Sequence, residues 1–186
     1  MSNLYFIALI PNQKIRQKVL ELKNEIKDKY GAAHALKSPA HITLVMPFRR
    51  KEDEEEQFCR VIRETAIGMK PFSIELEGFD VFAPRVLFIK IKKHESIAEV
   101  RKKLVRNLRN DAGFSPKETG SRFHPHMTIA TRDLTEDNFE IAWREFSERT
   151  FHDQWLCDGI YLLKHNGRHW DIYKRYPFMS SSINPH

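Results

Sequence analysis

Two short segments of the sequence carry the same pattern, a histidine followed two residues later by a threonine. The first segment is HITL at positions 41–44 and the second is HMTI at 126–129. Side chains on a β-strand alternate between its two faces, so each histidine shares a face with its threonine. The two apolar residues of each segment then lie on the opposite face. The sequence therefore predicts two strands that each present an imidazole and a hydroxyl to the same side.

Two imidazoles that meet in one cleft suit phosphoryl transfer between oxygen atoms. The pKa of histidine lies near 6.5, so both protonation states are available near neutral pH. A neutral imidazole can accept a proton from the attacking hydroxyl or water, and a charged one can protonate the leaving oxygen. The threonine hydroxyls can donate hydrogen bonds to the non-bridging phosphate oxygens. We therefore predict a catalytic site of His41, His126, Thr43 and Thr128 that needs no metal and no cofactor.

The segments around the two motifs repeat along the chain at an offset of roughly 80 residues. The matching positions are strand candidates beginning at 4 and 86, motif histidines at 41 and 126, helices opening near 51 and 135, and the segments EGFDVF at 77–82 and DGIYLL at 158–163. We therefore predict a single two-lobed catalytic domain over 1–178, with repeat units of about 1–83 and 84–178. Two such lobes, related by a pseudo-two-fold axis, would face each other across a cleft. The last residues, 179–186, are predicted to form a disordered tail.

Hydrophobic periodicity and turn residues predict an α+β fold, with two small antiparallel sheets that face the cleft and helices outside. Ser96 and Glu99 have the spacing of a capping box, and Thr135 precedes two acidic residues, so each is expected to open a helix. The predicted strands cover 4–10, 41–48, 72–82, 86–91, 123–131, 155–163 and 170–173, and the first helix covers 13–29.

The paired HITL and HMTI segments resemble the His-x-Thr-x signatures of the 2H phosphoesterase superfamily. The similarity extends over about 4–176 and includes the Pro125-His126 pair. The branch that the chain resembles is the RNA 2′,3′-cyclic phosphodiesterases, also called bacterial 2′-5′ RNA ligase-like proteins. This resemblance implies a two-lobed LigT-like fold and hydrolysis of 2′,3′-cyclic phosphate ends of RNA, or of a related cyclic nucleotide, to 2′-phosphates.

The resemblance also implies roles for the four motif residues. His41 would be the proton donor, His126 the proton acceptor, and Thr43 and Thr128 the phosphate anchors. The residues by themselves do not order the two histidines. Two alternatives also stay open, a 2′-5′ RNA ligase or 2′-5′ phosphodiesterase, and a non-catalytic RNA-binding module on the same scaffold, whose binding would depend on salt.

Two further residues are candidates for substrate binding. Many relatives carry an arginine at the position of Thr131, whereas here Arg132 follows one residue later. A shift of one residue reverses the strand face, and Arg132 would lie about 20 Å from His126 along an ideal strand. Phe48, at the end of the first motif strand, is a candidate to stack on a base, with core packing as the alternative.

The composition is that of an ordinary globular protein, with 41% apolar and 30% charged residues among 186 and a formal net charge of +6. No apolar run approaches the ~20 residues of a membrane span, and the N-terminus lacks the features of a signal peptide. Cys59 and Cys157 make no disulfide framework, so we expect a cytoplasmic protein with reduced thiols. The expected partners are RNA ends or cyclic and 2′-5′ nucleotides, with no membrane and no obligate protein partner, and the expected state is a monomer.

Overall fold

The structure is a computed structural model that describes residues 2–179. Its strands are β1 (Ser2–Leu9), β2 (Ile42–Lys51), β3 (Phe72–Phe82), β4 (Val86–Ile91), β5 (Met127–Ala130), β6 (His152–Cys157), β7 (Gly159–His165) and β8 (Trp170–Pro177). Its α-helices are α1 (Gln13–Tyr30), α2 (Glu55–Ala66), α3 (Glu95–Asp111), α4 (Pro116–Thr119) and α5 (Glu136–Ser147). Two short 3₁₀-helices, η1 (His34–Lys37) and η2 (Glu52–Glu54), precede β2 and α2.

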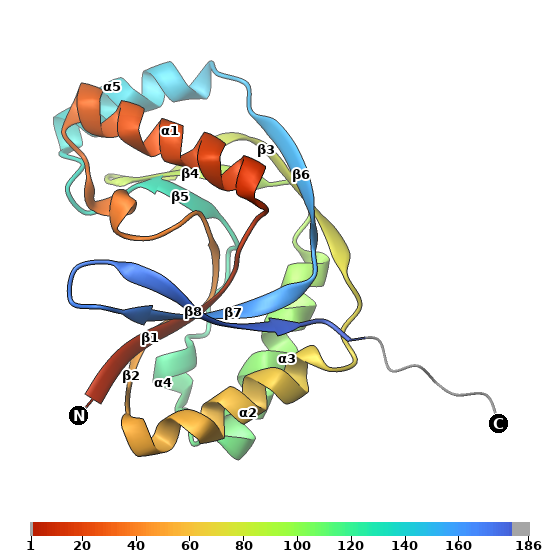
Figure 1. The fold of residues 1–186 in the computed structure, drawn as a ribbon. Helices are drawn as coiled ribbons and strands as arrows, with labels where there is room; N and C mark the ends of the chain where they lie inside the picture. The colour runs from red at the N-terminus through yellow and green to blue at the C-terminus, as the bar shows by residue number, and fades with distance from the viewer. Residues whose placement is uncertain (1, 180–186) are drawn as a thin grey trace.

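The strands of the described residues form two four-stranded sheets, both antiparallel throughout. Sheet 1 has the order β2-β1-β7-β8 and sheet 2 the order β5-β4-β3-β6. Helices α2 and α3 pack against sheet 1, whereas α1 and α5 pack against sheet 2 (Figure 1). The helices thus lie outside the two sheets, which confirms the predicted α+β class.

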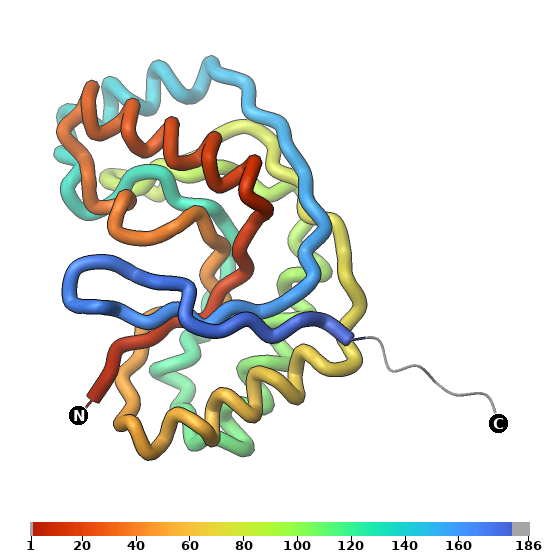
Figure 2. The backbone as a smooth tube through the Cα atoms, viewed as in Figure 1, coloured from red at the N-terminus to blue at the C-terminus, as the bar shows by residue number. Residues whose placement is uncertain are grey.

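The two sheets do not follow the two repeat units of the sequence. Strand β3, from the first unit, lies between β4 and β6 in sheet 2, and β7, from the second unit, pairs with β1 in sheet 1. The tube in Figure 2 shows the blue C-terminal strands lying across the red N-terminal strand. The run 155–163, predicted as one strand, is divided between β6 and β7 in different sheets. Each lobe is therefore assembled from both halves of the chain.

Local capping explains where several helices begin. Thr135 caps α5 as predicted, because its side-chain oxygen accepts a hydrogen bond from the Asn138 amide at 3.3 Å. The capping box predicted at Ser96 is wrong, since α3 begins one residue earlier, at Glu95, and the side chain of its N-cap, His94, makes no capping hydrogen bond to the helix. A capping box instead joins Ser115 and Glu118 and opens the short helix α4.

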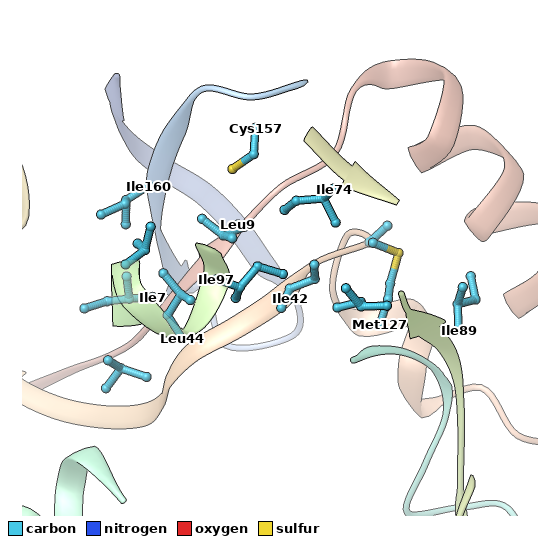
Figure 3. Packing of buried hydrophobic residues seen from close by; sticks show 14 of the residues in the cluster. Ile7, Leu9, Ile42, Leu44, Ile74, Ile89, Ile97, Met127, Cys157 and Ile160 are labelled. Carbon is cyan, nitrogen blue, oxygen red and sulfur yellow. The ribbon is translucent and has the colours of Figure 1, made fainter. Parts of the chain in front are cut away.

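The back faces of both motif strands are buried in one hydrophobic core. Ile42 and Leu44 of β2 and Met127 and Ile129 of β5 are buried, and all four belong to the same cluster. Figure 3 shows Ile42, Leu44 and Met127 within this cluster. The predicted alternation is therefore confirmed, and the core holds both motif strands so that their polar residues lie on the other face.

Met179 forms a bridge with Ile67, so the expectation of a disordered tail is wrong for this residue. The rest of the predicted tail, 180–186, lies outside the described residues. Within 2–179, no helix has the length and apolar character that crossing a membrane requires.

Candidate active site

The four motif residues line one cavity of about 310 Å³ between the two sheets. Each histidine stands just before its strand, His41 ahead of β2 and His126 ahead of β5, and each threonine follows on the same face. All four side chains are partly exposed, in contrast to the buried residues between them. The structure thus brings together the residues predicted from the two motifs, whose catalytic role stays a prediction.

The two imidazoles are held by the same kind of hydrogen bond. Nδ1 of His41 lies 2.7 Å from the carbonyl oxygen of Pro39, and Nδ1 of His126 lies 2.7 Å from that of His124. A carbonyl oxygen only accepts, so each Nδ1 carries a hydrogen and donates it. This bond orients each ring and leaves Nε2 as the nitrogen that can exchange a proton with a ligand.

Phenylalanines from neighbouring strands pack against both rings. The ring centroid of Phe6, on β1, lies 4.8 Å from that of His41. On the other side of the cavity, Phe82 and Phe88 lie 4.9 and 5.1 Å from His126. These apolar neighbours remove water from the imidazoles, which disfavours their charged forms.

Burial accordingly lowers the pKa of both histidines. For His41 burial lowers the pKa to about 4, against the opposing effect of the Pro39 carbonyl, and the charges of Lys23 and His126 lower it further. Burial also lowers the pKa of His126, with the His124 carbonyl again opposing it. Both rings are therefore neutral at pH 7 in the free protein. A bound phosphate anion would raise both pKa values, because its negative charge favours the imidazolium.

The lowered pKa of His41 predicts a loss of stability in mild acid. The folded-state pKa lies below the unfolded value of 6.5, so the unfolded chain binds more protons between these two values. The stabilisation from neutral His41 is complete above pH 6.5 and is lost as the pH falls toward 4, by up to about 3 kcal/mol. Denaturant unfolding of wild type and His41→Asn at pH 7 and pH 4.5 measures this loss.

The asparagine variant should lose less unfolding free energy between the two pH values than wild type. His169→Asn, in an exposed turn, is the matched control and should behave as wild type. An equal loss in wild type and His41→Asn would show that His41 does not contribute to the acid sensitivity.

Cationic and aromatic side chains also line the cavity, and its lining contains no carboxylate among the described residues. His34, Lys37 and Arg132 all line this cavity. Burial lowers the pKa of His34, and the positive charges of Arg132 and Lys37 lower it further. Trp170, at the start of β8, packs edge-on against Phe6 with ring centroids 4.7 Å apart. The cavity therefore offers positive charge for an anion and aromatic rings for a flat group.

Arg132 reaches the same cavity as His126, although an ideal strand would carry it far away. Strand β5 ends at Ala130, and Arg132 adopts a left-handed conformation with φ of 56°, so the chain turns there. The next residue, Asp133, accepts hydrogen bonds from the amides of Ala33 and His34 at 2.9 and 2.8 Å. These bonds join the turn after β5 to η1 at the edge of the cavity.

Phe48 does not line the cavity, and the prediction that it stacks on a base is wrong. Its side chain is only 4% exposed and packs against Tyr5, Phe58 and Phe114 in the core. Phe48 has the strand parity of Ile42 and Leu44, whereas Pro47 has the parity of His41 and lines the cavity. Strand alternation does not hold through the whole of β2, because the pairing with β1 is irregular around Val45, which is buried, while Met46 is exposed and lines the cavity. The side on which Phe48 lies therefore depends on this irregularity as well as on its position in the sequence.

Among the cavity residues that the sequence analysis did not single out as functional, four have charged, titratable or aromatic side chains that a ligand could contact. These are His34, Lys37, Phe82 and Trp170. They lie on η1, β3 and β8, which carry no catalytic motif and which reach the cavity only through the tertiary arrangement. His124, which with His126 could have formed a metal-binding pair, packs its ring against His94 at 5.1 Å. Within residues 2–179, no three or more histidine, cysteine or acidic side chains are placed to hold a metal.

Known proteins resemble this chain in sequence and in fold. A protein of Halalkalibacterium halodurans named "Putative phosphoesterase" is 29% identical over 176 residues, which cover 92% of this chain and 95% of that protein. A crystal structure from Thermus thermophilus has a TM-score of 0.68 at 18% identity, covering 96% of this chain and 99% of that one. The structure of Escherichia coli LigT complexed with 3′-AMP has a TM-score of 0.67 at 15% identity, with the same coverage.

The two structures, at these identities, confirm the LigT-like fold that the paired motifs implied. The sequence profile of the 2′-5′ RNA ligase superfamily matches residues 11–169, a span that contains both His-x-Thr motifs. Because this match covers most of the chain, the protein belongs to the 2′-5′ RNA ligase superfamily, a group of 2H phosphoesterases.

Proposed function

We propose that this protein hydrolyses 2′,3′-cyclic phosphate ends of RNA, or a related cyclic nucleotide, to 2′-phosphates. The observation that supports this proposal most directly is the pair of histidines in one cavity. Each donates a hydrogen bond from Nδ1 to a backbone carbonyl, which leaves Nε2 available for proton transfer. Membership of a phosphoesterase family supports chemistry on phosphate esters. The cationic and aromatic residues around the histidines suit the phosphate and the base of a nucleotide.

The proposed reaction transfers one proton at each histidine. Nε2 of His126 accepts a proton from water as the water oxygen attacks phosphorus. The bond between phosphorus and the 3′ oxygen breaks, and Nε2 of His41 donates a proton to that oxygen. The products are a 2′-phosphate and a 3′-hydroxyl, and exchange with solvent restores both histidines. The choice of His41 as donor follows from the family resemblance.

The two motif threonines stabilise the negative charge on the phosphate. The hydroxyls of Thr43 and Thr128 would donate hydrogen bonds to the two non-bridging oxygens of the phosphate, whose negative charge grows as water attacks. The substrate phosphate raises the pKa of His41, so that the ring can hold the proton that it later donates. Nucleotides also occupy a structural neighbour, since E. coli LigT has been crystallised with 3′-AMP and with NADP+.

The test is ring opening of an oligonucleotide with a 2′,3′-cyclic phosphate end in the presence of a chelator. Phosphorus NMR distinguishes a 2′-phosphate from a 3′-phosphate product, and we expect the 2′-phosphate. A 3′-phosphate product would overturn the assignment of the broken bond. Activity that is lost in chelator and restored by a divalent ion would overturn the metal-independent mechanism.

A second candidate, joining of RNA through a 2′-5′ linkage, is favoured by the name of the family. If a 5′-hydroxyl replaces water as the nucleophile, the same bond to the 3′ oxygen breaks and the same two histidines transfer the protons. Incubation of the cyclic phosphate with a 5′-hydroxyl oligonucleotide tests for the joined product. A protein that only binds RNA would produce neither product and would hold its ligand in a salt-dependent way.

A further inference from the structure

Lys23 is a charged side chain buried without a counter-ion. It lies on the face of α1 that packs toward the loop before β2, and it is only 3% exposed. Its Nζ donates a hydrogen bond to the carbonyl oxygen of Ser38 at 2.9 Å. No carboxylate within ion-pair distance of it occurs among residues 2–179, and burial alone accounts for its altered pKa. Burying a charged group without a counter-ion lowers the stability of the folded state, so the burial of the Lys23 ammonium calls for a physical explanation.

The Ser38–Ala40 turn connects Lys23 directly to His41. The carbonyl of Ser38 accepts from Lys23, and the next carbonyl along the chain, that of Pro39, accepts from Nδ1 of His41. Two consecutive peptide groups therefore hold the ammonium and the imidazole. Burial lowers the pKa of Lys23 to about 8, so the ammonium remains mostly charged at neutral pH.

The second motif has no equivalent of this charge among the described residues. His126 has the same carbonyl bond as His41 and similar aromatic neighbours, yet the only nearby charge that affects its pKa is that of His124. Lys23 therefore makes two otherwise similar histidines electrostatically different. A positive charge close to an imidazolium makes it a stronger acid, which suits a ring that must protonate a leaving oxygen.

We propose that Lys23 is a positioning residue for His41, which holds the turn that orients the ring and sets a positive charge behind it to favour release of its proton. The proposal rests on the proposed function for the donor role of His41. The other charged or titratable groups that face His41 around the cavity are His126 of the second motif, His34 and Lys37 of η1, and Arg132. Arg16 lines a small neighbouring cavity together with Lys23. Substitution of Lys23 leaves all of these groups in place.

Three substitutions separate the charge of Lys23 from its hydrogen bond. Lys23→Met removes both, Lys23→Gln removes the charge but keeps an amide donor, and Lys23→Arg keeps both. Lys27→Met, one turn further along α1 and exposed, is the matched control. If the methionine variant does not fold, the glutamine variant still tests the charge.

The first measurement is an NMR titration of both motif histidines in the protein without substrate, which does not depend on the proposed activity. We expect the pKa of His41 to rise by roughly half a unit or more in the methionine and glutamine variants. It should stay unchanged in Lys23→Arg and Lys27→Met, and the pKa of His126 should stay unchanged in all variants. No rise for His41 in folded Lys23→Met and Lys23→Gln would overturn the inference, whatever the activity of the protein.

The second measurement is the pH dependence of ring opening. Loss of the Lys23 charge should raise the pKa of His41, so the ring stays protonated up to a higher pH. The falling limb of the rate profile should therefore move to higher pH. The methionine variant should also lose more of kcat than the glutamine variant, since only the latter retains a donor for Ser38. Ring opening with the same pH profile in all four variants would overturn the inference and leave the proposed function standing. A wild-type protein that does not open the ring would instead overturn the proposed function, and the titration would still decide the role of Lys23.

Discussion

Replacement of His41 or His126 by alanine is expected to lower kcat/KM for ring opening by about 10²–10⁴-fold. Each ring supplies one of the two proton transfers, and no other titratable group in the described cavity lining is held by a carbonyl in the same way. His41→Gln and His126→Gln should be as impaired as the alanine variants. An amide can fill the space and form a hydrogen bond, but it cannot exchange a proton at pH 7.

The double variant sharpens this prediction. If the two histidines act as a unit in one step, removing both should cost little more than removing one, because either loss already disables the concerted transfer. His169→Ala, at an exposed turn outside the cavity, should retain wild-type activity. A single variant of His41 or His126 that keeps more than about a tenth of the wild-type kcat/KM would contradict the paired-histidine mechanism.

Thr43→Val and Thr128→Val are each expected to lower kcat/KM by about 10–100-fold, because hydrogen bonds to a charged group contribute about 1.5–3 kcal/mol. Valine has nearly the shape of threonine and suits a strand, so the substitution removes the hydroxyl with little change to β2 or β5. Thr43→Ser and Thr128→Ser should recover most of the loss. Inhibition constants for inorganic phosphate should rise in the valine variants, since phosphate would use the same two donors.

Thr150→Val, an exposed threonine that does not line this cavity, serves as the control. Unfolding midpoints should show that both motif variants remain folded at the assay temperature. Valine variants with unaltered phosphate inhibition would mean that the hydroxyls do not contact the phosphate, and the anchor role would have to be assigned elsewhere in the cavity.

Several features of this protein could be predicted from local patterns alone. The alternation within HITL and HMTI already placed Ile42 and Met127 in the core, because successive side chains of a regular strand point to opposite faces. Helix α1 was expected over 13–29 and covers Gln13–Tyr30, since its apolar stripe and its boundary at Gly31 are local signals. The repeat offset also indicated that two similar motifs would meet.

Other features depend on contacts between distant segments. Residues 155–163 have a continuous strand pattern, and their division between two sheets is decided by which strands they pair with, β3 for β6 and β1 for β7. The position of Arg132 depends on a left-handed residue after a strand shorter than expected. Strand pairing and chain turns of this kind are set by long-range packing, which local propensity does not encode.

By itself, the sequence determined the four motif residues, the α+β class and the side of each strand that carries the histidine. The tertiary structure alone decided that Phe82 and Trp170 border those histidines, and that, among the described residues, an unpaired ammonium lies behind only one of them. The physical reason is the range of the forces involved. Strand alternation and helical periodicity are set by residues a few positions apart in the sequence. Burial, and with it the pKa of His41, depends on every segment that packs around the ring.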